Sequence, residues 1–95
     1  MNYVQKIWET RYITGGNSGS GSYGVLCDYK AEFINTFIND KNIKSMIEFG
    51  SGDGNQMEHF KIDNYIGVDI SEYIINICKQ KYKDIANKNF ITYDE

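Results

Sequence analysis

Glycines and acids are concentrated where two apolar segments end, and residues of these types at such positions can bind a nucleoside. Residues 47–54 (IEFGSGDG) predict a buried strand and a glycine turn, and residues 65–69 (YIGVD) predict a second buried strand that ends in an acid. In a βαβ unit, an acid at that point lies beside the glycine turn and can accept hydrogen bonds from ribose hydroxyls. The pattern therefore favours a ligand that contains a nucleoside.

The spacing of the glycines indicates which ligand. A dinucleotide fingerprint would require glycine at position 55, which is asparagine here. An acid and three glycines instead alternate at Glu48, Gly50, Gly52 and Gly54. This arrangement resembles motif I of the class I S-adenosylmethionine-dependent methyltransferases, and Asp69 matches the acid that this family uses on the ribose. The ligand has no pyrophosphate, so the glycines would instead let the backbone approach its methionyl part.

The resemblance extends over nearly the whole chain, but covers only the first half of the family. Residues 8–12 (WETRY), 15–24 (GGNSGSGSYG), 29–32 (YKAE) and 54–56 (GNQ) resemble the N-terminal end of a bacterial-type branch. It implies a single partial methyltransferase domain over residues 1–95, with an N-terminal helix and a Gly/Ser-rich loop in residues 1–24 and a βαβαβ core in residues 25–95. The implied fold is α/β, a truncated Rossmann-like half-sheet of three parallel strands in the order 3-2-1, with flanking helices.

The resemblance also implies a set of cofactor-binding residues for S-adenosylmethionine, with S-adenosylhomocysteine as the product. They are Glu48, Gly50, Ser51, Gly52, Asp53, Gly54, Asp69, Ile70 and Asp94. Glu48 lies in a strand that should be buried, so it needs a partner: the ligand's ammonium group, backbone amides or a lysine. Asp53 has a second interpretation as an acid that only stabilises turn amides. Asp94 matches loosely an acid or amide that the family places near the adenine.

Composition restricts the function classes. The net charge is −3 and the pI is about 5.1, which argues against a nucleic-acid surface. No apolar run approaches the length of a membrane span, and no signal-peptide core is present at the N-terminus. Cys27 and Cys78 lack metal-ligand spacing and a companion histidine cluster, so we expect no metal. Because Cys78 lies on the apolar stripe of an expected helix, it is expected to be a buried free thiol rather than part of a disulfide, the alternative, which indicates a reducing compartment, the cytoplasm. We expect His59 to be a solvated surface residue.

The elements that position these residues follow from periodicity and caps. We expect a helix over residues 2–10, a loop over 14–24 that closes over a ligand or serves as a plain tether, and a helix whose apolar stripe is Leu26, Tyr29, Phe33, Ile34, Phe37 and Ile38. Strands are expected at residues 45–49, 64–69 and 89–93. A short helix carries Met57 and Phe60, and Ser71 caps a longer one.

Three functions fit these observations. The first is a methyltransferase-like protein with an unknown acceptor, inactive as an isolated chain because the acceptor side of the family's sheet is missing. The second is a non-catalytic scaffold or interaction module, and the third is a module for another adenosine compound. We also expect a homodimer, because the first strand would form an edge without the lysine, proline or bulge that prevents pairing. In the dimer either the first strands meet or helices cover that edge, and a two-fold axis would pair the strands antiparallel into a sheet of six across two chains.

Overall fold

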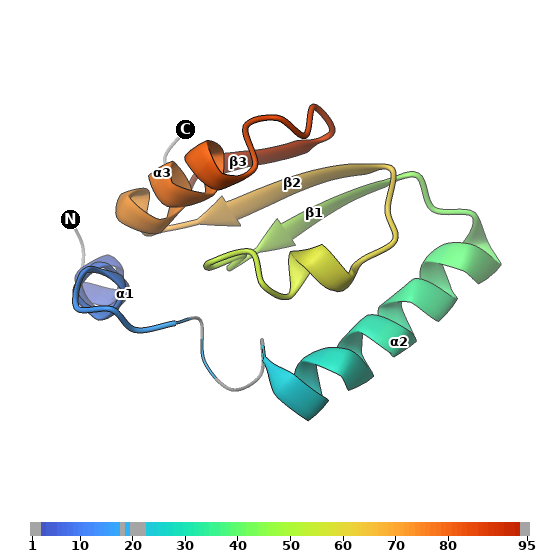
Figure 1. Ribbon diagram of the computed structural model, residues 1–95, viewed down its shortest axis with the longest axis horizontal. Helices are drawn as coiled ribbons and strands as arrows, with labels where there is room; N and C mark the ends of the chain where they lie inside the picture. Colours follow the sequence, from blue (N-terminus) through green and yellow to red (C-terminus); the bar gives the residue numbers. More distant parts are fainter. Residues whose placement is uncertain (1–2, 18, 20–22, 94–95) are drawn as a thin grey trace.

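The computed structural model describes residues 3–17, 19 and 23–93, and Asp94 lies outside them. Helices and strands alternate after a first pair of helices (Figure 1). Their bounds are α1 (Tyr3–Ile13), α2 (Gly24–Lys41), β1 (Ser45–Phe49), the short 3₁₀ helix η2 (Met57–His59), β2 (Asn64–Asp69), α3 (Glu72–Lys81) and β3 (Lys88–Thr92). The expected bounds of β1 and β2 are confirmed, and β3 begins and ends one residue earlier than expected.

The three strands form one open parallel sheet, with β2 between β1 and β3. Phe49 at the end of β1 pairs with Val68, and Asp69 at the end of β2 pairs with Thr92. Because the strands are parallel and in this register, their carboxyl ends meet at one edge of the sheet. The predicted α/β class, with three parallel strands and flanking helices, is confirmed.

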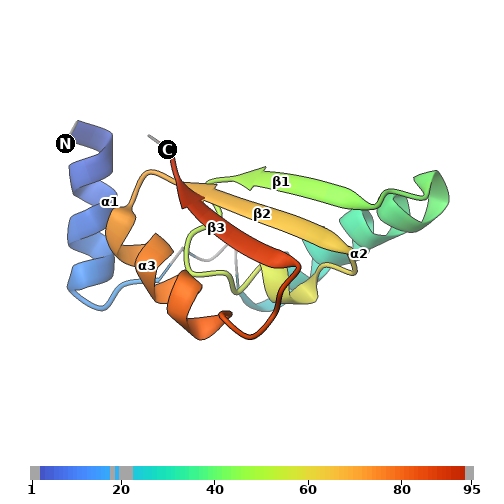
Figure 2. The same ribbon diagram turned by 90° about the horizontal axis from the view of Figure 1, so that it is seen from above.

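The described helices leave one face of the sheet uncovered. Figure 2 shows α2, η2 and α3 on the same face, while α1 stands beyond the carboxyl ends of the strands. The core lies between this face and the helices, and its buried residues are Ile38, Met57, Phe60, Ile62, Tyr65, Ile75, Cys78, Tyr82 and Phe90. Helix α3 begins as predicted, since the Ser71 hydroxyl accepts a hydrogen bond from the Ile74 amide at 3.2 Å.

The predicted helix α2 is present, but most of its apolar stripe does not face the core. Ile38 is buried and Ile34 packs against the core, whereas Tyr29 and Phe33 are 71% and 70% exposed. Leu26 and Phe37 are also exposed. Helix α2 lies at the border of the fold and is buried along a narrow strip only. The strip that tertiary packing selects contains the small residues Cys27 and Ala31.

Strand β1 forms an exposed edge. Among the described residues, no strand pairs with the side of β1 that faces away from β2. Ile47 and Phe49 point to the uncovered face and are 58% and 72% exposed.

Among the described residues, no helix has the length and apolar character needed to cross a membrane.

Candidate functional site

Three glycines shape a turn directly after β1. Gly50, Gly52 and Gly54 have φ angles of 78°, 59° and 83°, a region that residues with a Cβ atom rarely adopt. The turn is attached to the neighbouring strand, since the amides of Gly50 and Ser51 both donate to the Val68 carbonyl, over 2.7 and 3.0 Å. The glycines predicted from their spacing therefore form one turn at the carboxyl edge of the sheet.

The carboxylate of Asp69, at the end of β2, closes the other side of this turn. Its Oδ2 accepts a hydrogen bond from the Gly52 amide at 2.9 Å, and its Oδ1 accepts one from the Ser71 amide at 3.0 Å. The residue is buried. A carboxylate has about four acceptor positions, so these two hydrogen bonds leave about half of them for a ligand. Asp69 thus holds the turn in place and still has acceptor capacity.

A cavity of about 460 Å³ lies where the strands end. Its wall is formed by Tyr12, Phe49, Gly50, Val68, Asp69, Ile70 and Tyr93. Ligands of open α/β sheets bind outside the carboxyl ends of the strands, and small-molecule sites span roughly 300–1,000 Å³. Of the residues predicted to bind a cofactor, Gly50, Asp69 and Ile70 lie on this wall.

Two tyrosines complete the wall and were not predicted as site residues. Tyr93 directly follows β3, and its amide donates to the Asp69 carbonyl at 2.9 Å. Tyr12 is buried in the last turn of α1, which is fixed near the cavity by Glu9. The Glu9 carboxylate accepts a hydrogen bond from the Tyr73 amide at 3.0 Å, at the N-terminal end of α3, where an acid is favoured. A signal for Tyr12 existed, because it belongs to the segment 8–12 of the resemblance.

Glu48 is half-buried on the helix-covered side of β1 and does not line the cavity. Its partner is the Tyr65 hydroxyl, which donates to Oε1 at 2.5 Å, rather than a lysine or backbone amides. Burial raises the pKa of Glu48, while the hydrogen bond from Tyr65 and the charge of Lys30 act in the opposite direction. The need for a partner was predicted correctly, Tyr65 was not among the partners expected, and an interaction with a ligand's ammonium group stays a prediction.

Asp53 joins the glycine turn to the segment that precedes α2. Its Oδ1 accepts a hydrogen bond from the Asn55 amide at 3.0 Å, which is the expected work of an aspartate in a turn. Its Oδ2 accepts one from the Tyr23 hydroxyl. Burial and this carboxylate raise the pKa of Tyr23, so the hydroxyl keeps its proton.

The remaining predicted residues support the turn or lie outside the described structure. Ser51 is a buried residue of the turn itself. A Cβ atom on Gly54 would lie 2.9 Å from the ring of Tyr82. Residues 18 and 20–22 of the glycine-rich loop lie, like Asp94, outside the described residues, so closure of this loop over a ligand stays a prediction. At the start of the loop, the Arg11 guanidinium donates to the Asn17 carbonyl at 2.6 Å.

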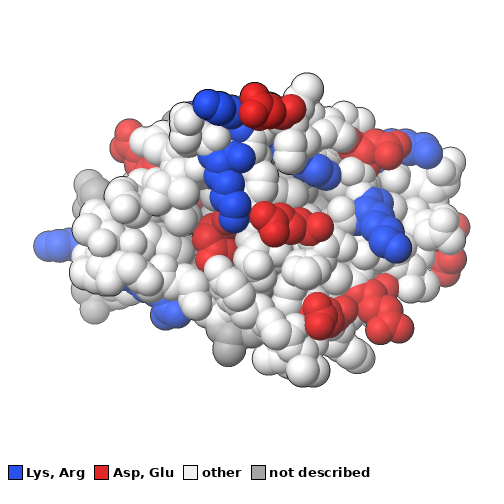
Figure 3. Space-filling model, in the orientation of Figure 1, with Lys and Arg blue, Asp and Glu red and all other residues white. Residues whose placement is uncertain are grey.

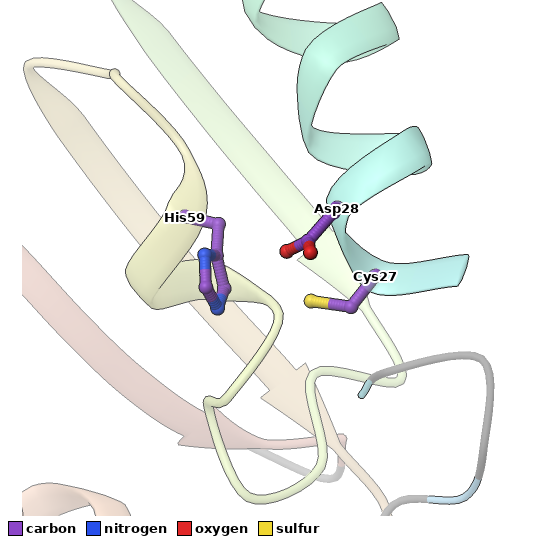
Figure 4. Close-up of side chains that lie close together, drawn as sticks. All are labelled: Cys27, Asp28 and His59. Atoms are coloured by element: carbon purple, nitrogen blue, oxygen red, sulfur yellow. The ribbon is translucent and has the colours of Figure 1, made fainter. Parts of the chain in front are cut away.

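The structure also brings together a group that the sequence did not reveal. Cys78 is free and buried and His59 is exposed, both as predicted, and Cys27 is also free and buried. The sequence shows no histidine cluster beside the cysteines, yet in the fold Cys27, Asp28 and His59 have ligand atoms within 4.8 Å of one another (Figure 4). No spacing rule could show this, since His59 reaches the pair from a different element.

Comparison with known proteins returned no relationship: no family model, no curated protein and no solved structure matches the chain. The resemblance to methyltransferases therefore rests on the residues named above.

Proposed function

We propose that the chain binds S-adenosylmethionine, or its product S-adenosylhomocysteine, in the cavity at the carboxyl ends of its strands. The observation that carries the proposal is the hydrogen bond between Asp69 and the Gly52 amide. It joins the acid that matches the family's ribose-binding residue to the turn that matches motif I. In this proposal the sheet is a Rossmann-like methyltransferase half, and the protein is methyltransferase-like with an unknown acceptor.

Each part of the wall has a role in this proposal. The free acceptor positions of Asp69 receive the ribose hydroxyls, and the bare backbone of Gly50 faces the methionyl part. Ile70 and Phe49 supply apolar surface for the adenine. Ser51, Gly52, Asp53 and Gly54 shape the turn, Glu48 acts on the ligand's ammonium group only through its charge, and Asp94 stays a proposed neighbour of the adenine.

The isolated chain should not transfer methyl groups at an appreciable rate. In the described residues no strand lies beyond β1, so nothing there orients an acceptor or excludes water from the reacting atoms. The described cavity wall also holds no histidine or cysteine that could act as a base or nucleophile. This second observation favours a non-catalytic scaffold that binds the ligand as the alternative function.

Calorimetric titration with S-adenosylmethionine, S-adenosylhomocysteine and ATP tests the proposal. We expect one site per chain for the first two ligands and weaker binding of ATP. Ile70→Trp fills the cavity without touching the hydrogen bonds of Asp69, so it should abolish binding. Asp63→Asn, at an exposed acid outside the cavity, should leave binding unchanged. Equal affinity for ATP would instead support a site for adenosine compounds in general, and no binding of either sulfur ligand would refute the proposal.

We also propose that a second copy of the chain covers the β1 edge. The edge has unpaired backbone groups, its exposed side chains Ile47 and Phe49 are apolar, and the one charge on the strand, Glu48, is engaged by Tyr65. An antiparallel pairing about a two-fold axis satisfies both copies with the same residues. A hollow of about 390 Å³ on the outer face of α2, lined by Phe33 and Phe37 among others, offers further apolar surface.

The face of the molecule shown in Figure 3 carries no large patch of one charge sign. On the face shown in Figure 3, acidic and basic side chains are interspersed over white, uncharged surface. This distribution agrees with an assembly held by apolar contacts and strand pairing rather than by charge.

A further inference from the structure

Three side chains with metal-binding atoms converge between α2 and η2, away from the cavity wall. Cys27 and Asp28 stand in the first turns of α2, and His59 is the last residue of η2. Figure 4 shows the thiol and the carboxylate turned toward the imidazole. The sulfur, a carboxylate oxygen and a ring nitrogen all lie within 4.8 Å of one another.

The backbone on both sides of this group is fixed by side chains of the opposite element. The Gln56 amide donates to the Cys27 carbonyl at 3.2 Å, and the Asn35 amide of α2 donates to the His59 carbonyl at 2.8 Å. The Asn55 amide also points at the Cys27 sulfur, at 3.9 Å. The first two hydrogen bonds fix the main chain of Cys27 and of His59 from the opposite element. The two halves of the group are therefore held at a set distance.

Neither exposed member of the group is engaged elsewhere. Within the described part of the chain, the Asp28 carboxylate and the His59 imidazole form no hydrogen bond or ion pair with another side chain.

We propose that Cys27, Asp28 and His59 form a binding site for Zn²⁺. Thiolate and imidazole are ligands that zinc prefers, and the sulfur disfavours magnesium and calcium. A thiolate and a carboxylate together neutralise the charge of the ion. Tetrahedral zinc with its usual bond lengths places ligand atoms roughly 3.3–3.7 Å apart, so any pair of ligand atoms must approach by at most about 1.5 Å. Asp28 and His59 are exposed side chains that are free to make this movement.

Binding would change the state of the thiol and tie two elements together. Burial and the charge of Asp28 raise the pKa of Cys27, so the free thiol is protonated. Formation of the Zn–S bond breaks the S–H bond and releases one proton to solvent. Water occupies the fourth position. The ion would join α2 to η2, directly after Asn55 and the glycine turn, and this inference does not depend on what the cavity binds.

Cobalt titration of the reduced protein tests the site, because Co²⁺ replaces Zn²⁺ and absorbs light when bound to a thiolate. We expect a thiolate-to-cobalt charge-transfer band that saturates at one Co²⁺ per chain and disappears when Zn²⁺ is added. No S-adenosylmethionine is present, so failure of the cavity proposal does not affect the result.

Variants then decide which atoms are responsible. Cys27→Ala should abolish the band, whereas Cys78→Ser, at the other buried thiol, should keep it. Removal of a residue that only hydrogen-bonds to a metal ligand weakens metal binding about 10- to 100-fold. Because His59 and Asp28 are proposed as ligands themselves, His59→Gln and Asp28→Asn should each weaken Zn²⁺ binding by at least about 10-fold. Both replace exposed side chains, so their folding is not at risk. The proposal is overturned if no band forms, if the band follows Cys78, or if neither His59→Gln nor Asp28→Asn weakens binding.

Discussion

Replacement of Asp69 by asparagine should both destabilise the fold and weaken ligand binding. Asparagine keeps the size of the side chain, but offers one carbonyl oxygen where the carboxylate offers two. Of the Gly52 and Ser71 amides, one then loses its acceptor and faces another N–H group. A buried donor without a partner costs about 1–3 kcal/mol, and the surviving hydrogen bond loses its charge, so we expect about 2–4 kcal/mol in total.

This loss is smaller than the stability of a typical chain of this size, about 5–14 kcal/mol for 95 residues, so Asp69→Asn should still fold. Equilibrium unfolding in urea measures the effect as a lower midpoint at an unchanged slope. In buffer where the variant is folded, the lost ribose contact should weaken S-adenosylmethionine binding about 10- to 100-fold, the equivalent of a hydrogen bond to a charged group.

Asp63→Asn is the matched control, since Asp63 is exposed and interacts with the lysines Lys44, at 3.9 Å, and Lys88. It should cost less than about 1 kcal/mol. If Asp69→Asn costs no more than this control, Asp69 does not hold the turn. If it destabilises the fold while the folded variant binds S-adenosylmethionine as tightly as the wild type, the ribose assignment is refuted.

Three further predictions concern stability and assembly. In the folded state, burial raises the pKa of Glu48 above its ordinary value of 4.5. The protonated side chain therefore contributes stability at low pH, and this contribution is lost as the pH rises from 4.5 through the folded-state pKa. Glu48→Gln should unfold at higher urea than the wild type at about pH 7, but not at about pH 4. An equal difference at both pH values would contradict this. Gly54→Ala combines a positive φ with a contact to Tyr82 and should cost at least about 2 kcal/mol, more than the control Gly15→Ala, where φ is positive but space is open. Similar losses would show that the contact is unimportant. Light scattering should show a dimer at micromolar concentration and a monomer for Ile47→Lys, and a folded wild-type monomer would disprove the assembly.

Features that depend on neighbouring residues were predictable from the sequence. The bounds of β1 and β2, the glycine turn and the Ser71 cap follow from backbone preferences and short-range hydrogen bonds, which act within a few residues. The alternation of strands and helices predicts a parallel βαβ unit, and this topology is what places Gly50 and Asp69 on one cavity wall.

Features that depend on how elements pack were decided only by the tertiary structure. Periodicity showed that α2 has a wide apolar surface, but not that only the strip with Cys27, Ala31 and Ile38 would be buried. Tyr12 reaches the cavity because Glu9 attaches α1 to the start of α3. His59 reaches Cys27 because η2 packs against α2. Such contacts join residues far apart in the chain, and their energies depend on the shapes of both surfaces, which no local pattern contains.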